Sequence, residues 1–321
     1  MKQLLNCIVT SILASYFLTI GCSSNERPSP ESEKIPSPIT VIATEEKGFA
    51  TFTNKLHPDN AIGYRFFEHS PIVFGLEPKN NDEAGIVLAE DSALEKQFAN
   101  RSGVLTQEVL VEQKDLWIRQ DWTFYLAPAA DGIDLLFVIK TYDHGLSEYY
   151  GVQQCFRMSG ATNEAWRGQI ANTPDFSEYD LWHQEKDLVN KTSLTFVLRN
   201  GEWEPLPAIP ECVGSRTGLG VAIDKKRTGG SLPEEVGPYK AKMFEPIDNG
   251  LITRTNKEGT WLSGIYWENT SHVTNHHPAD CLHAIVNIGN IPANSKRAVR
   301  GKIYWFKGSK EDLTRKFQED F

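Results

Sequence analysis

Short segments in which apolar and polar residues alternate recur along most of the chain. Glycine, proline, asparagine and aspartate separate them, and this spacing is typical of sandwiches and barrels of antiparallel strands. The segments that we predict as strands are 40–44, 49–53, 86–90, 116–126, 133–141, 149–158, 192–198, 202–206, 251–255, 261–267, 282–288 and 297–306. Asn200-Gly201 separates two of them, and this dipeptide favours a two-residue hairpin turn. The pattern therefore predicts a mainly β fold, a large antiparallel β-sandwich.

Helix signals are few. Ser92 and Glu95 are spaced like a capping box before a short apolar segment, and Ser309 and Asp312 repeat that spacing near the end of the chain. We therefore expect one short internal helix and a C-terminal helix.

Two stretches have a composition that differs from the strands. Residues 161–190 are polar with scattered aromatic residues, and we predict one or two helical turns there. Residues 208–238 are rich in glycine and proline. A loop of that length is uncommon in a compact domain, so it contains a further strand at 220–223 or forms a functional loop.

The strand predicted at 116–126 has two contrasting faces. Apolar residues on one face, interrupted by Gln120, point to a core, whereas the other face mixes aromatic and charged residues. Arginine and carboxylate side chains orient hydroxyl groups, and aromatic rings stack on sugars. With Arg157 on a nearby strand, this face would suit a neutral or anionic glycan, and the alternative is a solvated face with cross-strand ion pairs. The candidate ligand-binding residues are Trp117, Arg119, Asp121, Tyr125 and Arg157.

Four of the eight histidines lie within residues 261–289, and an aspartate and a cysteine lie among them. Proline disfavours helical geometry in the residue before it, so Pro278 excludes a zinc site on a helix. We predict that these histidines lie in a loop between two strands, and that His283 enters the second strand on the face opposite Leu282, Ala284 and Val286. The candidate catalytic residues are His272, His276, His277, His283 and Asp280.

The histidine segment permits three interpretations. The imidazoles of His272, His276, His277 and His283 could bind a divalent metal. They could instead act as acid and base near neutral pH. The structural alternative is a buried corner in which histidines and Asn275 satisfy the hydrogen bonds of the backbone.

The N-terminus has the features of a secretory signal: Lys2, a mostly apolar stretch, and a small residue before Cys22. Residues 18–22, Leu-Thr-Ile-Gly-Cys, resemble the lipobox of bacterial lipoproteins, although Thr19 stands where leucine is usual. The resemblance implies that a signal peptide, residues 1–21, is removed and that Cys22 carries lipid, including palmitate. The alternative is an ordinary secretory signal.

Residues 22–38 are dense in proline, serine and charge and lack aromatic residues. Such a segment buries too little apolar surface to become ordered, so we predict a disordered tether. Residues 39–321 then form a single large domain.

Charge and motifs exclude several classes of function. The formal net charge is −9, with one short basic run at 225–227, so we expect no nucleic-acid partner. The sequence has no GxGxxG, phosphate-loop, GxSxG or HExxH motif, which excludes the common nucleotide enzymes and serine hydrolases. Cys155, Cys212 and Cys281 permit one disulfide and one thiol, or three thiols.

The predicted strands are similar in architecture to mutarotase-like supersandwiches and to other carbohydrate-active sandwiches, without a matching catalytic motif. The mature part also resembles uncharacterised secreted bacterial proteins with an HHPADCLH segment and a KRAVRGKIYWF strand. We therefore predict a cell-envelope lipoprotein, anchored through Cys22 on the outer membrane or periplasmic face, that binds or processes a carbohydrate. The alternatives are a non-catalytic structural or assembly lipoprotein and a metal-dependent enzyme that uses the histidines.

Overall fold

The computed structural model describes residues 36–44, 48–66, 73–76, 85–113, 118–146, 149–157, 194–206, 221–222, 247–256, 258–276, 281–288 and 291–321. All of them belong to one compact unit that spans residues 36–321. The predicted signal peptide, Cys22, most of the tether, Trp117, the helical turns at 161–190, His277 and Asp280 lie outside the described residues. Within the described part, no helix combines the length and the apolar character that crossing a bilayer requires.

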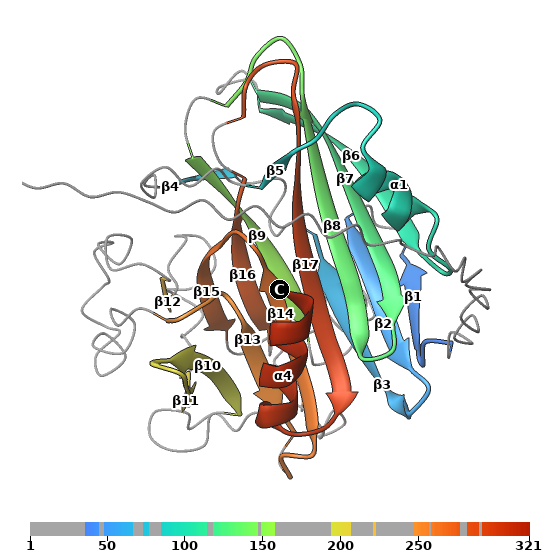
Figure 1. Cartoon of the computed structure of the whole chain (residues 1–321), viewed down its shortest axis with the longest axis vertical. Coiled ribbons are helices and arrows are strands. Elements are labelled where there is room, and N and C mark those ends of the chain that lie inside the picture. Colours follow the sequence, from blue (N-terminus) through green and yellow to red (C-terminus); the bar gives the residue numbers. More distant parts are fainter. Residues whose placement is uncertain are drawn as a thin grey trace, which may run out of the picture. The chain divides into compact units, whose positions relative to one another are not determined.

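The described residues form two antiparallel sheets that pack face to face (Figure 1). The eight-stranded sheet contains β1 (Ile39–Ala43), β2 (Phe49–Asn54), β3 (His57–Arg65), β9 (Tyr149–Arg157), β16 (Cys281–Asn287), β15 (Thr270–His276) and β12 (Val221–Ala222) in that order, with β4 (Val73–Leu76) paired to β9. The nine-stranded sheet contains β11 (Glu202–Pro205), β10 (Thr195–Arg199), β13 (Ile252–Thr255), β14 (Trp261–Trp267), β17 (Lys296–Lys307), β8 (Gly132–Thr141), β7 (Ile118–Ala129) and β6 (Leu105–Gln113), with β5 (Ile86–Val87) paired to β17. The predicted mainly β sandwich is confirmed.

The core lies between the two sheets because each strand turns alternate side chains inward. Phe137 of β8 is at the centre of an aromatic cluster in this core. Its ring stacks on Phe124 of β7 with centroids 4.3 Å apart, and the rings of Trp122 and Trp267 meet it edge-on. Gln120 is also buried on the inward face, where it accepts a hydrogen bond from Trp122 Nε1 at 2.7 Å. The predicted core face of this strand is confirmed, including its polar exception.

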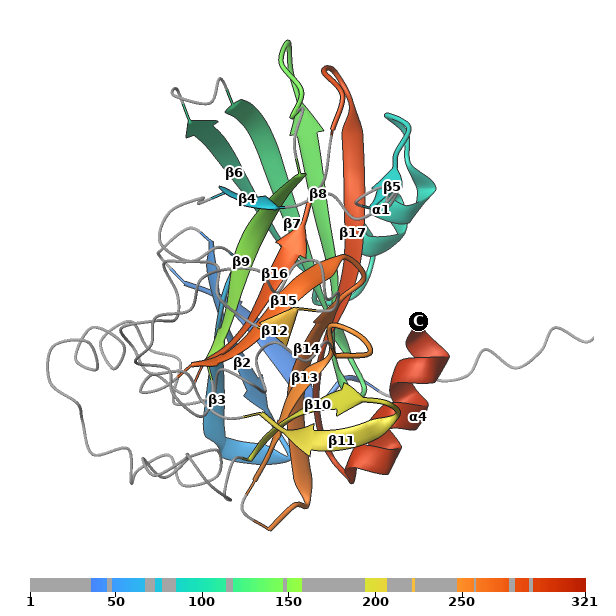
Figure 2. The same ribbon diagram turned by 90° about the vertical axis from the view of Figure 1, so that its left-hand side faces the viewer.

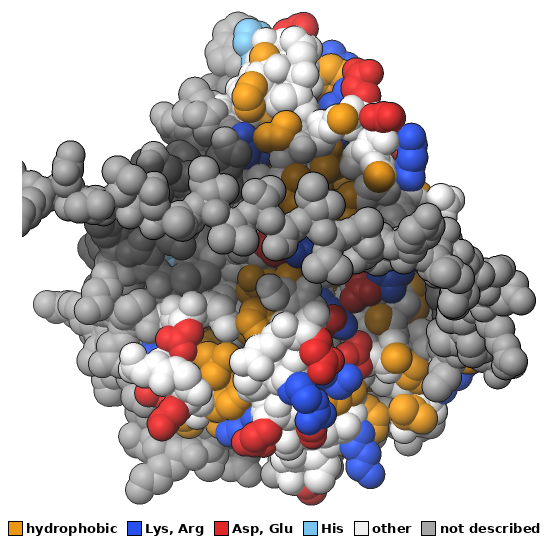
Figure 3. Space-filling view, in the orientation of Figure 1, with side chains coloured by type: hydrophobic (Ala, Val, Ile, Leu, Met, Phe, Trp, Pro, Cys, Tyr) orange, Lys and Arg blue, Asp and Glu red, His pale blue; other side chains and the backbone are white. Residues whose placement is uncertain are grey.

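Two helices cover parts of the outward face of the nine-stranded sheet. Helix α1 (Ala93–Ala99) begins at Ser92, whose side chain caps it. Helix α4 (Lys310–Asp320) begins at Ser309 with a complete capping box and lies across β14 and β17 (Figure 1). Both predicted helices are confirmed. In Figure 3 acidic and basic side chains gather over the position of α4, so the exposed side of this helix is solvated.

Apolar side chains fill the contacts beneath both helices. Phe98 of α1 packs with Tyr125, Ala127, Leu136, Val138 and Ala298, and Leu313 of α4 packs with Leu251, Leu262, Tyr304 and Phe306. Apolar contacts therefore bury much of the interface between each helix and the sheet.

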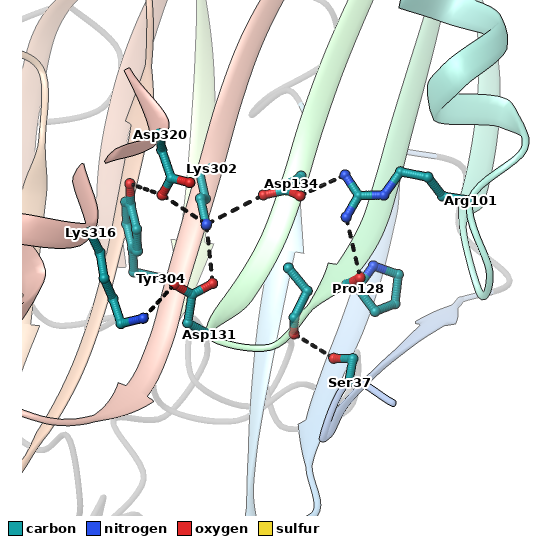
Figure 4. Close-up of polar contacts among 10 residues, drawn as sticks. Ser37, Arg101, Pro128, Asp131, Asp134, Lys302, Tyr304, Lys316 and Asp320 are labelled. Carbon is teal, nitrogen blue, oxygen red and sulfur yellow. Dashed lines mark hydrogen bonds and ion pairs between the residues drawn. The ribbon is translucent and has the colours of Figure 1, made fainter. Parts of the chain in front are cut away.

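A buried ammonium group connects α4 to the sheet (Figure 4). Lys302 Nζ of β17 lies 3.1 Å from Asp131 Oδ1, 3.6 Å from Asp134 Oδ1 and 2.8 Å from Asp320 Oδ2. Lys316 Nζ of α4 lies 3.0 Å from Asp131 Oδ2. The β7–β8 turn, β17 and the end of α4 are thus held by one network of charges.

Some elements differ from the sequence-based expectations. The strands β3, β4, β6 and β15 were not predicted, whereas the hairpin at Asn200-Gly201 is confirmed, with positive φ angles of 51° and 78° that suit a tight turn. Ser37 Oγ donates a hydrogen bond to the carbonyl of Ala129 at 2.5 Å, so contacts of the sandwich reach into the predicted tether.

Candidate functional site

The outward face of β9, β16 and β15, in the middle of the eight-stranded sheet, is mostly polar and buried. In β9, β16 and β15, which run side by side in Figure 2, the residues that alternate with core residues are mostly polar. We call the polar face the set Arg65, Gln153, Cys155, Arg157, His272, Thr274, His283 and Asn287, whose side chains are each at most 9% exposed.

Strand register brings members of the polar face into rows. His283 of β16 pairs with Thr274 of β15 on one side and with Cys155 of β9 on the other, and Cys155 pairs in turn with Arg65 of β3. Paired residues on one face have Cβ atoms about 5 Å apart. An imidazole, a hydroxyl, a thiol and a guanidinium therefore line up across four strands.

A second row lies beside the first. Ile285 of β16 pairs with His272 of β15 and with Gln153 of β9. Since Ile285 and His283 are two positions apart on the same strand face, His272 and Gln153 are both diagonal neighbours of His283. Gln153 Nε2 lies 3.3 Å from His283 Nδ1. The polar face thus holds two imidazoles on adjacent strands, one of them in contact with a buried amide.

The prediction that the histidines lie in a loop between two strands is wrong for residues 270–276. Thr270–His276 is the strand β15, which forms a hairpin with β16, and Pro278 follows it. In β15 Val273 and Asn275 turn inward, so His272 and Thr274 lie on the opposite face. The predicted orientation of His283, opposite Leu282, Ala284 and Val286, is confirmed.

The structure places two of the candidate catalytic residues on one face. His272 and His283 share the polar face, whereas His276 ends β15 opposite Cys281, and its side chain is outside the described part. His277 and Asp280 also lie outside it. Among the described residues, no group of three or more histidine, cysteine or acidic side chains could hold a metal ion.

The candidate ligand-binding residues do not form one surface, which corrects that expectation. Arg157 belongs to the polar face, whereas Arg119, Asp121 and Tyr125 lie on the outward face of β7 in the other sheet. The two sets turn away from each other because outward faces of a sandwich point in opposite directions.

Tyr125 is enclosed beneath α1. Its hydroxyl donates a hydrogen bond to Glu95 Oε1 at 2.9 Å, and its side chain packs with Phe98. Burial raises the pKa of Tyr125, and the carboxylate of Glu95 raises it further. Tyr125 therefore anchors α1 and does not present a stacking surface for a sugar.

Arg119 and Asp121 lie near the other end of β7 and contact Tyr142. The Arg119 guanidinium lies over the Tyr142 ring, 5.2 Å from its centroid, and the Tyr142 hydroxyl donates to Asp121. The hydrogen bond to Asp121 raises the pKa of Tyr142. Arg119 Nε also lies 3.7 Å from Glu112 Oε1. This cluster therefore fits the alternative interpretation of the strand, a solvated face with cross-strand ion pairs.

Five members of the polar face were missing from the sequence-based candidates: Arg65, Gln153, Cys155, Thr274 and Asn287. Arg65 lies on β3, where the segment HPDNAIGYR contains proline and glycine and did not read as a strand. Cys155 carries a buried thiol between Arg65 and His283. Because side chains alternate along a strand, the inward side chain of Phe156 implies an outward side chain for Cys155. Which residues lie beside Cys155 depends on the order of the strands in the sheet.

No family model and no curated protein matches the chain. Among solved structures, it is similar to a galactose mutarotase related enzyme from Lactobacillus acidophilus, with 6% sequence identity and a TM-score of 0.33. The similarity covers 85% of this chain and 98% of that chain.

Proposed function

We propose that this protein is a membrane-anchored lipoprotein of the cell envelope that binds or processes a carbohydrate at the polar face. The observation that carries this proposal is the contrast between its two buried outward faces. Beneath α1 and α4 the outward face of the nine-stranded sheet is largely apolar, with its buried charges paired around Lys302, whereas the outward face of β9, β15 and β16 is buried and mostly polar.

A sheet face that only supports packing gains most from apolar side chains, because their burial is favourable. A carbohydrate needs many donors and acceptors at fixed positions. Imidazole, amide, hydroxyl and guanidinium groups on adjacent strands supply both, and the backbone of the sheet holds them rigidly.

His272 and His283 are our candidates for the reacting groups if the sugar is processed. Imidazole exchanges protons near neutral pH, and two imidazoles on adjacent strands could serve as acid and base on one sugar. Arg65 and Arg157 would orient its oxygen atoms through the fixed geometry of the guanidinium donors.

Calorimetric titration of the full chain, purified in detergent, tests binding at the polar face. With D-glucose, D-galactose, D-mannose and N-acetyl-D-glucosamine as probes, we expect saturable binding of at least one. His283→Asn and His272→Asn should each weaken it by about tenfold or more, because the shorter amide of asparagine does not reach the position of the distal imidazole nitrogen in a buried site. Polarimetry of the bound sugar then shows whether it is only held or also converted.

Arg119→Ala is the matched control, since Arg119 lies on the other sheet with an exposed side chain. It should leave binding unchanged. Circular dichroism melting of each variant separates lost binding from lost folding. Binding that survives both histidine substitutions in folded protein, or is lost in Arg119→Ala, contradicts the proposed site.

Lipid on Cys22 is the second part of the proposal and rests on the lipobox resemblance of residues 18–22. Cys22→Ser should abolish the incorporation of radiolabelled palmitate, because the thiol is the proposed attachment point. It should also move the protein from the membrane fraction to the soluble fraction. Cys155→Ser is the control and should remain in the membrane; equal labelling of both variants would contradict the anchor.

A further inference from the structure

Hydrogen bonds fix the place where the predicted tether joins the sandwich. Ser37 Oγ donates to the carbonyl of Ala129 at 2.5 Å, and the backbone N–H of Lys55 donates to the carbonyl of Pro38 at 2.9 Å. Ala129 lies at the turn between β7 and β8, beside which Figure 4 shows Ser37, and Lys55 lies at the turn between β2 and β3. The tether therefore joins the domain at the end that carries these two turns.

The β2–β3 turn consists of Lys55 and Leu56. Two-residue hairpin turns favour glycine, asparagine and aspartate, and Asn200-Gly201 follows this rule between β10 and β11. Leu56 does not, and at 67% it is the most exposed large apolar residue in the described part of the chain. Folding of the domain thus leaves this side chain in water, although its burial elsewhere would be favourable.

The β2–β3 turn is held at a fixed position. Asn54 is 1% exposed, and its Oδ1 accepts a hydrogen bond from the backbone N–H of Leu56 at 3.0 Å. Its Nδ2 donates to the carbonyl of Trp305, on β17 of the other sheet, at 3.4 Å. The buried amide of Asn54 therefore connects the turn to both sheets and displays Leu56 rigidly.

Charge at this turn suits an anionic lipid surface. Lys55 is exposed directly beside Leu56. Asp131, in the β7–β8 turn at the same end, is paired with Lys302 and Lys316, so its negative charge is compensated. A leucine that enters the boundary of the acyl chains, next to a lysine that reaches the headgroups, is the combination that interfacial binding uses.

We propose that the β2–β3 turn is a second membrane contact, in which Leu56 enters the bilayer interface and Lys55 contacts the phosphates of anionic lipids. This inference rests on the lipid anchor proposed at Cys22. Residues 22–37 span at most about 55 Å, so the anchor keeps the end of the sandwich that carries Ser37 within that distance of the bilayer. The turn then orients the domain, with the β7–β8 turn also facing the membrane.

Photocrosslinking of the full chain tests the contact. The photoreactive residue p-benzoylphenylalanine replaces Leu56 in one protein and Leu110 in the matched control. Leu110 is 53% exposed but pairs with Asp121, about 27 Å along β7 from Ala129. Both proteins are reconstituted into vesicles of phosphatidylethanolamine and phosphatidylglycerol with tritiated acyl chains. After irradiation, position 56 should carry at least about fivefold more lipid label than position 110.

Lys55→Glu tests the charge. Combined with the probe at position 56, it should lower crosslinking in these vesicles by about fivefold or more, because a carboxylate replaces an ammonium group at an anionic surface. In vesicles of phosphatidylcholine, which carry no net charge, the change should be less than about twofold. Circular dichroism melting verifies that each variant is folded. An equal change in both kinds of vesicle would overturn the contact of Lys55 with anionic lipid.

The same probes combined with Cys22→Ser separate the turn from the anchor. Preferential crosslinking at position 56 in protein without lipid supports the turn, even where native protein incorporates no palmitate and the anchor is refuted. Membrane-bound native protein that crosslinks equally, or not at all, at the two positions overturns the inference and leaves the anchor intact. Crosslinking of position 56 to a second copy of the chain in place of lipid also overturns it, and protein with neither palmitate nor crosslinks refutes both.

Discussion

Phe137→Ala is expected to lower the free energy of unfolding by about 4 kcal/mol, the range found when a large buried side chain is truncated to alanine. Phe137 is fully buried between the sheets, with Phe124 stacked on one side at 4.3 Å and Trp122 edge-on at 5.2 Å. Removal of its ring leaves a cavity lined by rigid aromatic rings that cannot collapse to fill it. Chemical denaturation monitored by tryptophan fluorescence measures the change.

Phe137→Leu is the matched control, because leucine keeps most of the apolar volume. This substitution should lower the free energy of unfolding by about 1.5 kcal/mol or less. If Phe137→Ala and Phe137→Leu lower the free energy of unfolding equally, the aromatic contacts of Phe137, and not the volume that it fills, determine its contribution to stability. A loss below about 1 kcal/mol for alanine would contradict the close packing of this cluster.

Lys302→Met is expected to lower the free energy of unfolding by about 3 kcal/mol, because three partly buried carboxylates lose the ammonium group that they share. Lys302 contacts Asp131, Asp134 and Asp320, and its own side chain is 7% exposed. Arg315→Met is the control: Arg315 is 65% exposed in an ion pair within α4, so its loss should cost about 0.5 kcal/mol or less.

The effect of Lys302→Met should depend on pH in a defined direction. Burial alone would raise the pKa of Asp131, but the ammonium groups of Lys302 and Lys316 outweigh it and hold that pKa below its ordinary value. Burial alone would lower the pKa of Lys302, but the carboxylates of Asp134, Asp320 and Asp131 outweigh it and raise that pKa.

A lowered carboxyl pKa gives stability that is present above its ordinary value and is lost as the pH falls through the folded value. A raised lysine pKa gives stability that is complete below its ordinary value and is lost as the pH rises through the folded value. The difference between the native protein and Lys302→Met should therefore be largest from about pH 5 to pH 10 and narrow on both sides. Urea denaturation across this range measures it, and a difference independent of pH would contradict the network.

Hydrophobic alternation was sufficient to predict the inward face of the strands that it identified. In β7 the inward positions of Trp122 and Phe124 follow from their spacing, as does the outward position of Asp121. Capping spacing was sufficient for α1 and α4, and Asn200-Gly201 was sufficient for its hairpin. These signals are local, because each depends on residues within a few positions of one another.

The histidine segment shows where local signals were insufficient. Pro278 excluded a helix, but β15 forms because β16 and β12 offer backbone partners. Its inward Asn275 is held by Arg254 Nη2 at 2.9 Å, from a strand of the other sheet. No pattern within residues 270–276 encodes either partner.

Membership of the polar face was likewise decided by strand order. Arg157 was paired from sequence with Arg119 and Asp121, yet β7 and β9 belong to different sheets, so these side chains point away from each other. Arg65 reaches the row of His283 because β3 pairs with β9, although the two strands are far apart in the chain.

The sequence by itself determined the class of fold, the inward face of most strands and the orientation of His283, because the backbone geometry of a strand converts spacing directly into direction. Only the tertiary structure decided which strands are neighbours, and therefore that Gln153, His272 and His283 lie on one face while Tyr125 packs beneath a helix. Pairing between distant strands depends on the burial of the whole sandwich, and no short segment carries that information.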